Sequence, residues 1–194
     1  MAKTLLVIDA HPASGNTFCG ALLSAYEDAA RAAGATVKRL VLRDLAFDPV
    51  RRKGYGVEEE WEPDLAEAWR LIEAADHLCF AYPTWWGGHP ALLEGFFERV
   101  FVNGKAFRYH DNGPWWDKLL AGKTADVLTT MDTPPLYYWL VYRNCGLTRV
   151  GKTILGYVGI KPKLHAFGAI RSSTEKKRKR WLAKATALGA AAAV

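Results

Sequence analysis

The sequence predicts an α/β fold with a doubly wound, five-stranded parallel sheet of strand order 2-1-3-4-5 and helices on both faces. Three observations support this prediction. Short apolar runs alternate with amphipathic segments through all 194 residues, which implies right-handed crossovers between parallel strands. The run 5–8 is continuously apolar, as expected for a strand covered on both faces. No linker rich in Gly, Pro and Ser interrupts the chain, so we expect one domain over residues 1–194.

The individual elements follow from local patterns. Apolar runs predict strands at residues 5–8, 37–42, 77–82, 124–130 and 163–170. Helical spacing of apolar residues predicts helices at residues 18–33, 64–74, 91–101, from about 136 with a second piece near 152, and from 174 onward. Gly34 is expected to end the first helix, and Pro83 is expected to end the third strand. Residues 43–63 and 103–122 are expected to be long connections.

The positive charge of the chain is concentrated in one place. The formal net charge is +6, and residues 175–184, with six basic residues and one Glu, account for +5 of it. A basic face over the whole molecule is therefore absent, and a run of this kind is usually a solvated helix face. We expect no nucleic-acid partner, although a nucleic-acid-associated protein that uses this run is a weaker alternative.

The sequence lacks the signals typical of membrane, secreted and metal-binding proteins. No apolar run approaches the roughly 20 residues that span a bilayer, so no membrane insertion is expected. The apolar stretch before Asp9 is too short, and is followed by a charge too soon, to be a signal peptide. The three cysteines are scattered and show neither a disulfide framework nor a zinc-binding spacing. A cytoplasmic protein without a metal is therefore expected.

In a sheet of this order, ligands bind outside the carboxyl ends of the strands, beside the point where the strand order reverses. The loop after the first strand has mostly short or polar side chains, and it leads directly into a helix. Free amides at a helix N-terminus suit a phosphate, with Thr17 as an N-cap or donor and His11 as a further donor. An ordinary capped turn is the alternative interpretation of this loop.

The loop after the third strand contains Trp85 and Trp86 between Pro83 and two glycines. Exposed aromatic rings at this edge of the sheet indicate a wall for a planar ring system, although a subunit interface would also use them. Thr129 and Thr130 end the fourth strand and offer hydroxyls. Neither a carboxylate pair nor a Ser–His–Asp arrangement stands out in these loops, so a cofactor is expected to supply the chemistry.

The segment from Tyr82 to Phe101 resembles the NAD(P)H:quinone oxidoreductase family, which comprises DT-diaphorase and its bacterial relatives. Weaker similarities extend over nearly the whole chain and include His11, residues 47–49, residues 73–76 and the pair Thr129 and Thr130. The resemblance implies a flavodoxin-like fold, a homodimer, and non-covalent FAD or FMN. It implies transfer of two electrons from NADH or NADPH to a quinone-like acceptor. A regulatory flavoprotein subunit of a membrane transporter is the alternative.

The resemblance also implies roles for single residues. The expected flavin-binding residues are His11, Thr17, Phe18, Pro83, Thr84, Trp85, Trp86, Gly87, Thr129, Thr130, Arg178 and Leu182. Tyr137 falls on the active-site Tyr of the family, and Phe107 and Tyr109 fall on the aromatic pair that closes the substrate pocket. Arg143 takes the place of a His that takes part in charge relay, so we expect Tyr137 and Arg143 to be catalytic. The positions of Arg178 and Leu182 favour FAD, whereas the short connection 43–63 favours FMN.

Overall fold

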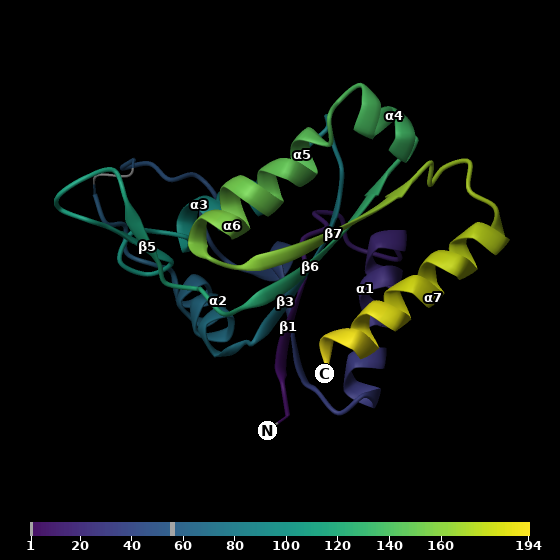
Figure 1. Ribbon diagram of the computed structural model, residues 1–194, viewed down its shortest axis with the longest axis horizontal. Helices are drawn as coiled ribbons and strands as arrows, with labels where there is room; N and C mark the ends of the chain where they lie inside the picture. The colour runs from purple at the N-terminus through teal and green to yellow at the C-terminus, as the bar shows by residue number, and fades with distance from the viewer. Residues whose placement is uncertain (1, 55–56) are drawn as a thin grey trace.

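A computed structural model describes residues 2–54 and 57–194 (Figure 1). Its centre is a five-stranded sheet of order β2-β1-β3-β6-β7, in which every neighbouring pair is parallel. Counted along the sheet-forming strands alone, this is the order 2-1-3-4-5, so the predicted fold class is confirmed. The strands of the sheet are β1 (Thr4–Asp9), β2 (Thr36–Val41), β3 (His77–Pro83), β6 (Thr124–Met131) and β7 (Lys161–Gly168).

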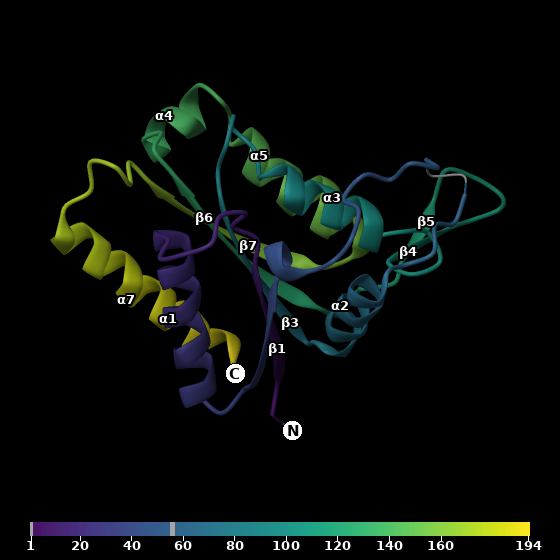
Figure 2. The same ribbon diagram turned by 180° about the vertical axis from the view of Figure 1, so that it is seen from behind.

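Helices cover both faces of the sheet, and each face has its own apolar cluster (Figures 1 and 2). On one face lie α1 (Phe18–Ala32) and α7 (Glu175–Ala192). On the other lie α2 (Pro63–Ala74), α3 (Ala91–Val100) and a continuous run of α5 (Cys145–Thr148), η2 (Arg149–Leu155) and α6 (Gly156–Val158). The short α4 (Pro135–Leu140) lies at the carboxyl edge of β6, and η1 (Leu42–Asp44) follows β2.

The closing helix α7 packs directly on α1. A Cβ atom at Gly189 would lie 2.0 Å from the carbonyl oxygen of Tyr26, so only glycine permits this approach. Trp181 is buried, and Leu182 is half-buried against the same apolar cluster, as the sequence predicted for the inward side of this helix. Of the six basic residues in 175–184, Lys177 is half-buried and the other five are exposed.

A polar network is buried between α1 and the strands β3, β6 and β7. The carboxylate of Asp126 accepts hydrogen bonds from the Tyr26 hydroxyl at 2.9 Å and from His165 Nε2 at 2.9 Å. His77 Nε2 lies 2.8 Å from the Tyr26 hydroxyl, and its Nδ1 lies 2.7 Å from the hydroxyl of Thr124. Burial raises the pKa of Asp126, but hydrogen bonds from His165, His77 and Tyr26 outweigh that effect and hold the pKa well below its usual range.

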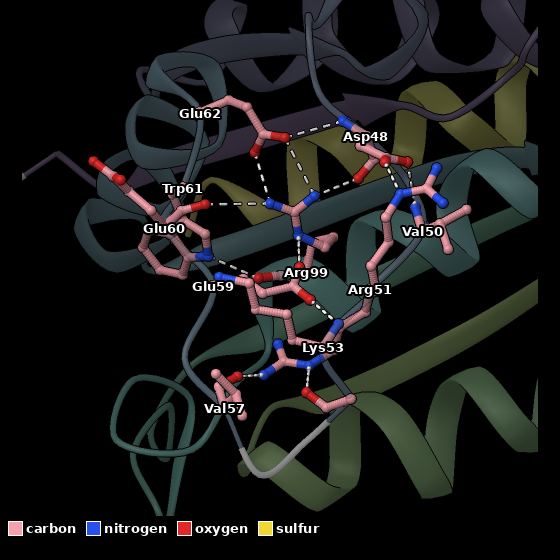
Figure 3. Close-up of polar contacts among 12 residues, drawn as sticks. Asp48, Val50, Arg51, Lys53, Val57, Glu59, Glu60, Trp61, Glu62 and Arg99 are labelled. Atoms are coloured by element: carbon pink, nitrogen blue, oxygen red, sulfur yellow. Dashed lines mark hydrogen bonds and ion pairs between the residues drawn. The ribbon is translucent and has the colours of Figure 1, made fainter.

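The connection between η1 and α2 is fastened to α3 by Arg99 (Figure 3). The Arg99 side chain is buried, and its Nη2 donates to Glu62 Oε2 at 2.7 Å while its Nη1 donates to the carbonyl of Asp48. Burial raises the pKa of Glu62, but hydrogen bonds from the Asp48 amide and Arg99 lower it below the usual value. The predicted connection 43–63 is thus ordered around one cation, apart from residues 55–56, which lie outside the described residues.

Two sequence predictions need correction. The connection 103–122 is not only a loop, because it contains the antiparallel hairpin of β4 (Phe107–Tyr109) and β5 (Trp116–Lys118). The last strand covers Lys161–Gly168 rather than 163–170. It ends early because Gly168 packs against the Thr133 carbonyl and because Ala169 takes a left-handed conformation (φ 61) that turns the chain. Among the described residues, none of the helices combines the length and apolar character needed to cross a membrane.

Candidate functional site

The loop after β1 presents a histidine whose tautomer is fixed by its neighbours. The Ala13 amide donates to His11 Nδ1 at 3.1 Å, so Nδ1 is the unprotonated nitrogen and Nε2 carries the proton. The backbone of His11 is anchored by Asp9, whose carboxylate accepts the His11 amide, and by Arg43, whose Nη1 donates to the His11 carbonyl at 3.2 Å. The Nε2–H group of His11 is therefore available to an acceptor at this edge of the sheet.

The N-terminus of α1 forms the second part of the site. The Thr17 hydroxyl accepts the Gly20 amide at 3.0 Å, which confirms Thr17 as the N-cap and leaves its own proton free to donate. The Arg178 guanidinium lies 5.6 Å from the centre of the Phe18 ring and donates to the Ile170 carbonyl. Leu182 packs against the apolar cluster on the face of the sheet that α1 and α7 cover. The structure therefore places Arg178 against Phe18, beside the N-cap Thr17, and Leu182 in the apolar cluster that Phe18 also joins.

The loop after β3 is a tight turn that places a Trp, Trp86, in a left-handed conformation. Trp85 and Gly88 exchange two backbone hydrogen bonds of 2.9 Å, and the central residues Trp86 and Gly87 both have positive φ, 52° and 79°. This geometry matches a type I′ turn, in which a residue as bulky as Trp is strained. The Trp86 side chain is fully exposed (106%) and makes no packing contribution.

Only part of this turn has free amides. The Thr84 amide donates to the Thr130 carbonyl at 2.7 Å, and the Trp85 amide donates to Gly88, so both are engaged. Within the described residues, the amides of Trp86 and Gly87 have no hydrogen-bond partner. The turn therefore offers two adjacent donors beside an exposed indole, which suits the polar edge and the flat face of one heterocycle.

The ends of β3 and β6 meet next to this turn. Thr129 is fully buried, and its hydroxyl lies 2.7 Å from the hydroxyl of the half-buried Thr84. Thr129 is thus placed to orient Thr84 rather than to touch a ligand. The rings of His11 and Trp85 meet edge-on with centroids 6.3 Å apart, so the loops after β1 and β3 are also in contact.

The segment after β6 carries the two expected catalytic residues. Tyr137 is 48% exposed, and its ring packs edge-on against Tyr142. Arg143 is exposed and takes a left-handed conformation (φ 52) beyond the end of α4. Tyr138 alone among the residues of α4 is buried, and its hydroxyl donates to the Gly87 carbonyl at 2.8 Å.

The structure does not bring Phe107 and Tyr109 to the turn 85–88 of their own chain. Their rings meet edge-on with centroids 5.2 Å apart, and both line a cavity of about 300 Å³ between α3, η2 and the β4–β5 hairpin. The Tyr157 hydroxyl donates to the Tyr109 hydroxyl at 3.2 Å. Burial and this hydrogen bond raise the pKa of Tyr157 to about 12.

The described residues contain no group of three or more His, Cys, Asp and Glu side chains suited to a metal ion. Cys19 and Cys79 are buried, and burial raises the pKa of both thiols. Cys145 is exposed, with its Sγ 3.5 Å from the Gly87 carbonyl oxygen. The groups available at the strand ends therefore include hydroxyls, amides, aromatic rings, cations and the thiol of Cys145.

A family model described as a flavodoxin-like fold matches residues 3–188, nearly the whole chain. The chain belongs to this family. The Smu.1420 protein from Streptococcus mutans UA159 has the same fold, with a TM-score of 0.78, 29% identity, and coverage of 97% of this chain and 99% of that chain.

Two curated relatives match shorter stretches. NAD(P)H dehydrogenase [quinone] 1 of Rattus norvegicus is 39% identical over 83 residues, which are 41% of this chain and 29% of that protein. The FMN-dependent NADH:quinone oxidoreductase of Caldicellulosiruptor saccharolyticus is 34% identical over 103 residues, or 51% of this chain and 47% of that protein. The chain thus spans less than half the length of both of these relatives.

Sequence reasoning missed two residues that shape the site. Arg43 bonds to both Asp9 and the His11 carbonyl, and its position directly after β2 on the same sheet edge was the available signal. Tyr138 stands in a run of exposed aromatic residues, and nothing in the sequence separates it from Tyr137 or Tyr142.

Proposed function

We propose that this protein is a flavin-dependent oxidoreductase that passes two electrons from NADH or NADPH to a quinone-like acceptor. The observation that carries the proposal is the turn 85–88, where two unengaged amides adjoin a fully exposed indole at the strand ends. The names of the two curated relatives support this reaction class. Among the described residues, no side chain of these loops can accept a hydride and pass it on, so a bound cofactor must carry the two electrons from the nicotinamide to the acceptor.

The residues present fit a flavin. The protonated Nε2 of His11, the free proton of the Thr17 hydroxyl and the N-terminus of α1 are donors suited to its phosphate. The amides of Trp86 and Gly87 are donors suited to the carbonyl edge of its ring, and the indoles of Trp85 and Trp86 can cover its face. Pro83, Thr84 and Thr130 complete the lining in this proposal.

When bound, the flavin supplies hydride acceptance from the nicotinamide and two-electron transfer to the acceptor. Within this chain, the hydroxyl of Tyr137 and the guanidinium of Arg143 are the groups we assign to catalysis. A preorganised hydroxyl or cation beside the position where negative charge develops lowers the barrier without itself reacting. In this proposal, the exposed indoles of Trp85 and Trp86 shield the face of the bound ring from water.

We propose FAD as the flavin, with FMN as the alternative. Arg178 and Phe18 form a cation–π pair beside the N-cap of α1, and Leu182 extends the apolar surface there, so an adenosine group has a place to lie. The name of the Caldicellulosiruptor relative, an FMN-dependent enzyme, favours FMN. The mass of the flavin that heat releases from the purified protein distinguishes the two.

We further propose a homodimer. Phe107 and Tyr109 line a cavity that the residues of the turn 85–88 do not share, so within one chain they cannot close a pocket over a ring held there. A second copy can bring its own pair to this turn. Size-exclusion chromatography with light scattering tests the dimer, and Tyr109→Ala should then raise the KM for quinone.

The two alternative functions receive less support. Both curated relatives are named as a quinone-dependent dehydrogenase or oxidoreductase, which favours the enzyme over a transporter subunit. Along α7, Lys177 lies over the Trp181 ring at 4.8 Å, and Lys179 pairs with Glu175 at 2.8 Å, so part of the basic run is engaged within the helix. We therefore expect only weak, salt-dependent binding of polyanions.

The deciding experiment is titration of the purified protein with FAD and with FMN, followed by reduction with NADH or NADPH under anaerobic conditions. We expect stoichiometric flavin binding, bleaching of the flavin absorbance by the nicotinamide, and reoxidation by a soluble quinone. Absence of bound flavin and of any thermal shift would overturn the proposed function. Flavin binding without reduction by either nicotinamide would instead favour a role other than this oxidoreductase.

A further inference from the structure

Two donors from one segment converge on a single carbonyl of the turn 85–88. The Tyr138 hydroxyl donates to the Gly87 carbonyl oxygen at 2.8 Å, and Cys145 Sγ lies 3.5 Å from the same atom. The Tyr138 hydroxyl also accepts the Gly146 amide at 3.0 Å. One buried hydroxyl, only 1% exposed as a residue, thus joins the loop after β3 to the start of α5.

The packing between these two segments leaves no space for adjustment. A Cβ atom on Gly146 would lie 2.2 Å from the Gly87 carbonyl oxygen and 2.8 Å from Gly88 Cα. Arg149 makes a second connection, because its Nη1 donates to Glu94 Oε2 at 2.7 Å and Glu94 in turn bonds to His89. The segment 138–149 therefore holds the turn at its tip and again where it enters α3.

The turn needs such support because its conformation is intrinsically unfavourable. Trp86 is held at a φ of 52° without any packing of its side chain, a combination that persists only where surrounding contacts impose it. The Gly87 carbonyl belongs to the peptide group between Gly87 and Gly88, so the hydrogen bond from Tyr138 restrains that group. Because the two Trp85–Gly88 hydrogen bonds close the turn, this restraint also limits the rotation of the adjoining peptide groups, which carry the free amides of Trp86 and Gly87.

We propose that Tyr138 is a positioning residue, which holds the turn 85–88 in the conformation that presents the Trp86 and Gly87 amides to the flavin. The inference rests on the proposed function. Tyr138 acts through the turn and touches neither flavin nor substrate, since its hydroxyl is occupied by Gly87 and Gly146.

The test compares Tyr138→Phe with Tyr142→Phe. The first change removes the bridging hydroxyl and keeps the ring, whereas the second removes an exposed hydroxyl from the same segment. We expect the flavin Kd to rise about tenfold in Tyr138→Phe, the size of effect that loss of one buried hydrogen bond produces, and to stay unchanged in Tyr142→Phe. At saturating flavin, the visible absorption bands of the flavin should also shift in Tyr138→Phe only, because donors at the ring edge set their position.

A second pair of variants tests the same contact through Gly146, with Gly151 as the control position. Gly146→Ala would place a methyl group against the Gly87 carbonyl, while Gly151→Ala places one against the flexible end of Leu164 at 2.9 Å. We expect weaker flavin binding and a shifted flavin spectrum in Gly146→Ala, and wild-type values in Gly151→Ala.

The outcomes separate the two proposals. A wild-type protein that binds no flavin removes the proposed function and this inference together. Wild-type protein that binds flavin, with Tyr138→Phe showing a lower melting temperature but an unchanged Kd and spectrum, would leave the function standing and overturn the positioning role. A raised Kd and shifted spectrum in both Tyr138→Phe and Gly146→Ala, with normal controls, support it.

Discussion

The hydroxyl groups of Thr84 and Thr129 lie 2.7 Å apart and join the end of β3 to β6 at the edge where the candidate site lies. Thr129 is fully buried, so its contribution to a ligand must pass through Thr84. We expect Thr129→Val to leave the Thr84 hydroxyl free to rotate and to weaken flavin binding by about 1 kcal/mol, the net value of a typical hydrogen bond. Flavin titration by fluorescence measures this change.

A control for this prediction lies on the same strand. Thr124 is at the opposite end of β6, and its hydroxyl bonds to His77 Nδ1 in the buried network. Thr124→Val should lower the free energy of unfolding without changing the flavin Kd. Equal flavin affinities in wild type and Thr129→Val would show that Thr84 needs no orientation.

The second prediction concerns Trp86, whose backbone is strained and whose side chain is fully exposed. Asn tolerates a positive φ far better than Trp, so Trp86→Asn should raise the stability of the flavin-free protein by roughly 1 kcal/mol, or about 2–4 °C in Tm. The same change removes the indole from the proposed site, so quinone turnover should fall. Thermal unfolding and steady-state kinetics measure the two effects.

Trp115 provides the matched control because it is also exposed, at 69%, but has no left-handed backbone. Trp115→Asn should leave both Tm and turnover near the wild-type values. A drop in Tm for Trp86→Asn would mean that the indole contributes packing, and retained turnover would remove Trp86 from the site.

Much of the fold was predictable because each main element buries a long, regular pattern. The apolar run of β1 and the amphipathic faces of α1 and α2 identify them without reference to the rest of the chain. The β4–β5 hairpin was missed because its strands have three residues each, too few to show an alternation of apolar and polar side chains. Its aromatic residues therefore read as part of a loop.

The candidate site was predictable only at the level of its loops. The strand order determines which loops meet, so the contact between His11 and Trp85 follows from topology. The conformation of Trp86 does not follow, since a bulky residue is a poor indicator of a left-handed turn. The choice of Tyr138 rather than Tyr137 as the buried ring depends on tertiary packing alone.

The third prediction concerns thiol reactivity. Burial raises the pKa of Cys19 and Cys79, while Cys145 is exposed, so iodoacetamide should modify one thiol in the folded protein and three after denaturation. The added group at Cys145 would sit against the Gly87 carbonyl, 3.5 Å from Sγ, and should weaken flavin binding. Mass spectrometry of peptides and flavin titration check both statements.

Cys145→Ser is the control, because it retains a donor at this position and cannot be alkylated. It should bind flavin like the wild type and should keep that affinity after treatment with iodoacetamide. Modification of Cys19 or Cys79 in the folded protein would contradict their burial. An unchanged Kd after modification of Cys145 would show that the turn tolerates a bulky group there.

The last prediction concerns acid stability and rests on Asp126. Its pKa is held well below the usual range in the folded protein, whereas in the unfolded chain it should titrate near ~3.9. The charged carboxylate therefore contributes stability that is fully present above pH ~5, one unit above the unfolded pKa. That contribution declines by up to roughly 1.4 kcal/mol per pH unit as the pH falls from there towards the folded pKa, since only the unfolded chain takes up the proton.

Asp126→Asn lacks this proton uptake. It should be less stable than wild type at pH 7 because it loses the charged acceptor for Tyr26 and His165, yet its stability should fall less steeply below pH 4. Urea unfolding at a series of pH values measures both slopes, with the exposed Asp28→Asn expected to keep the wild-type slope. Parallel curves for wild type and Asp126→Asn would mean that Asp126 has the same pKa in the folded and unfolded chains.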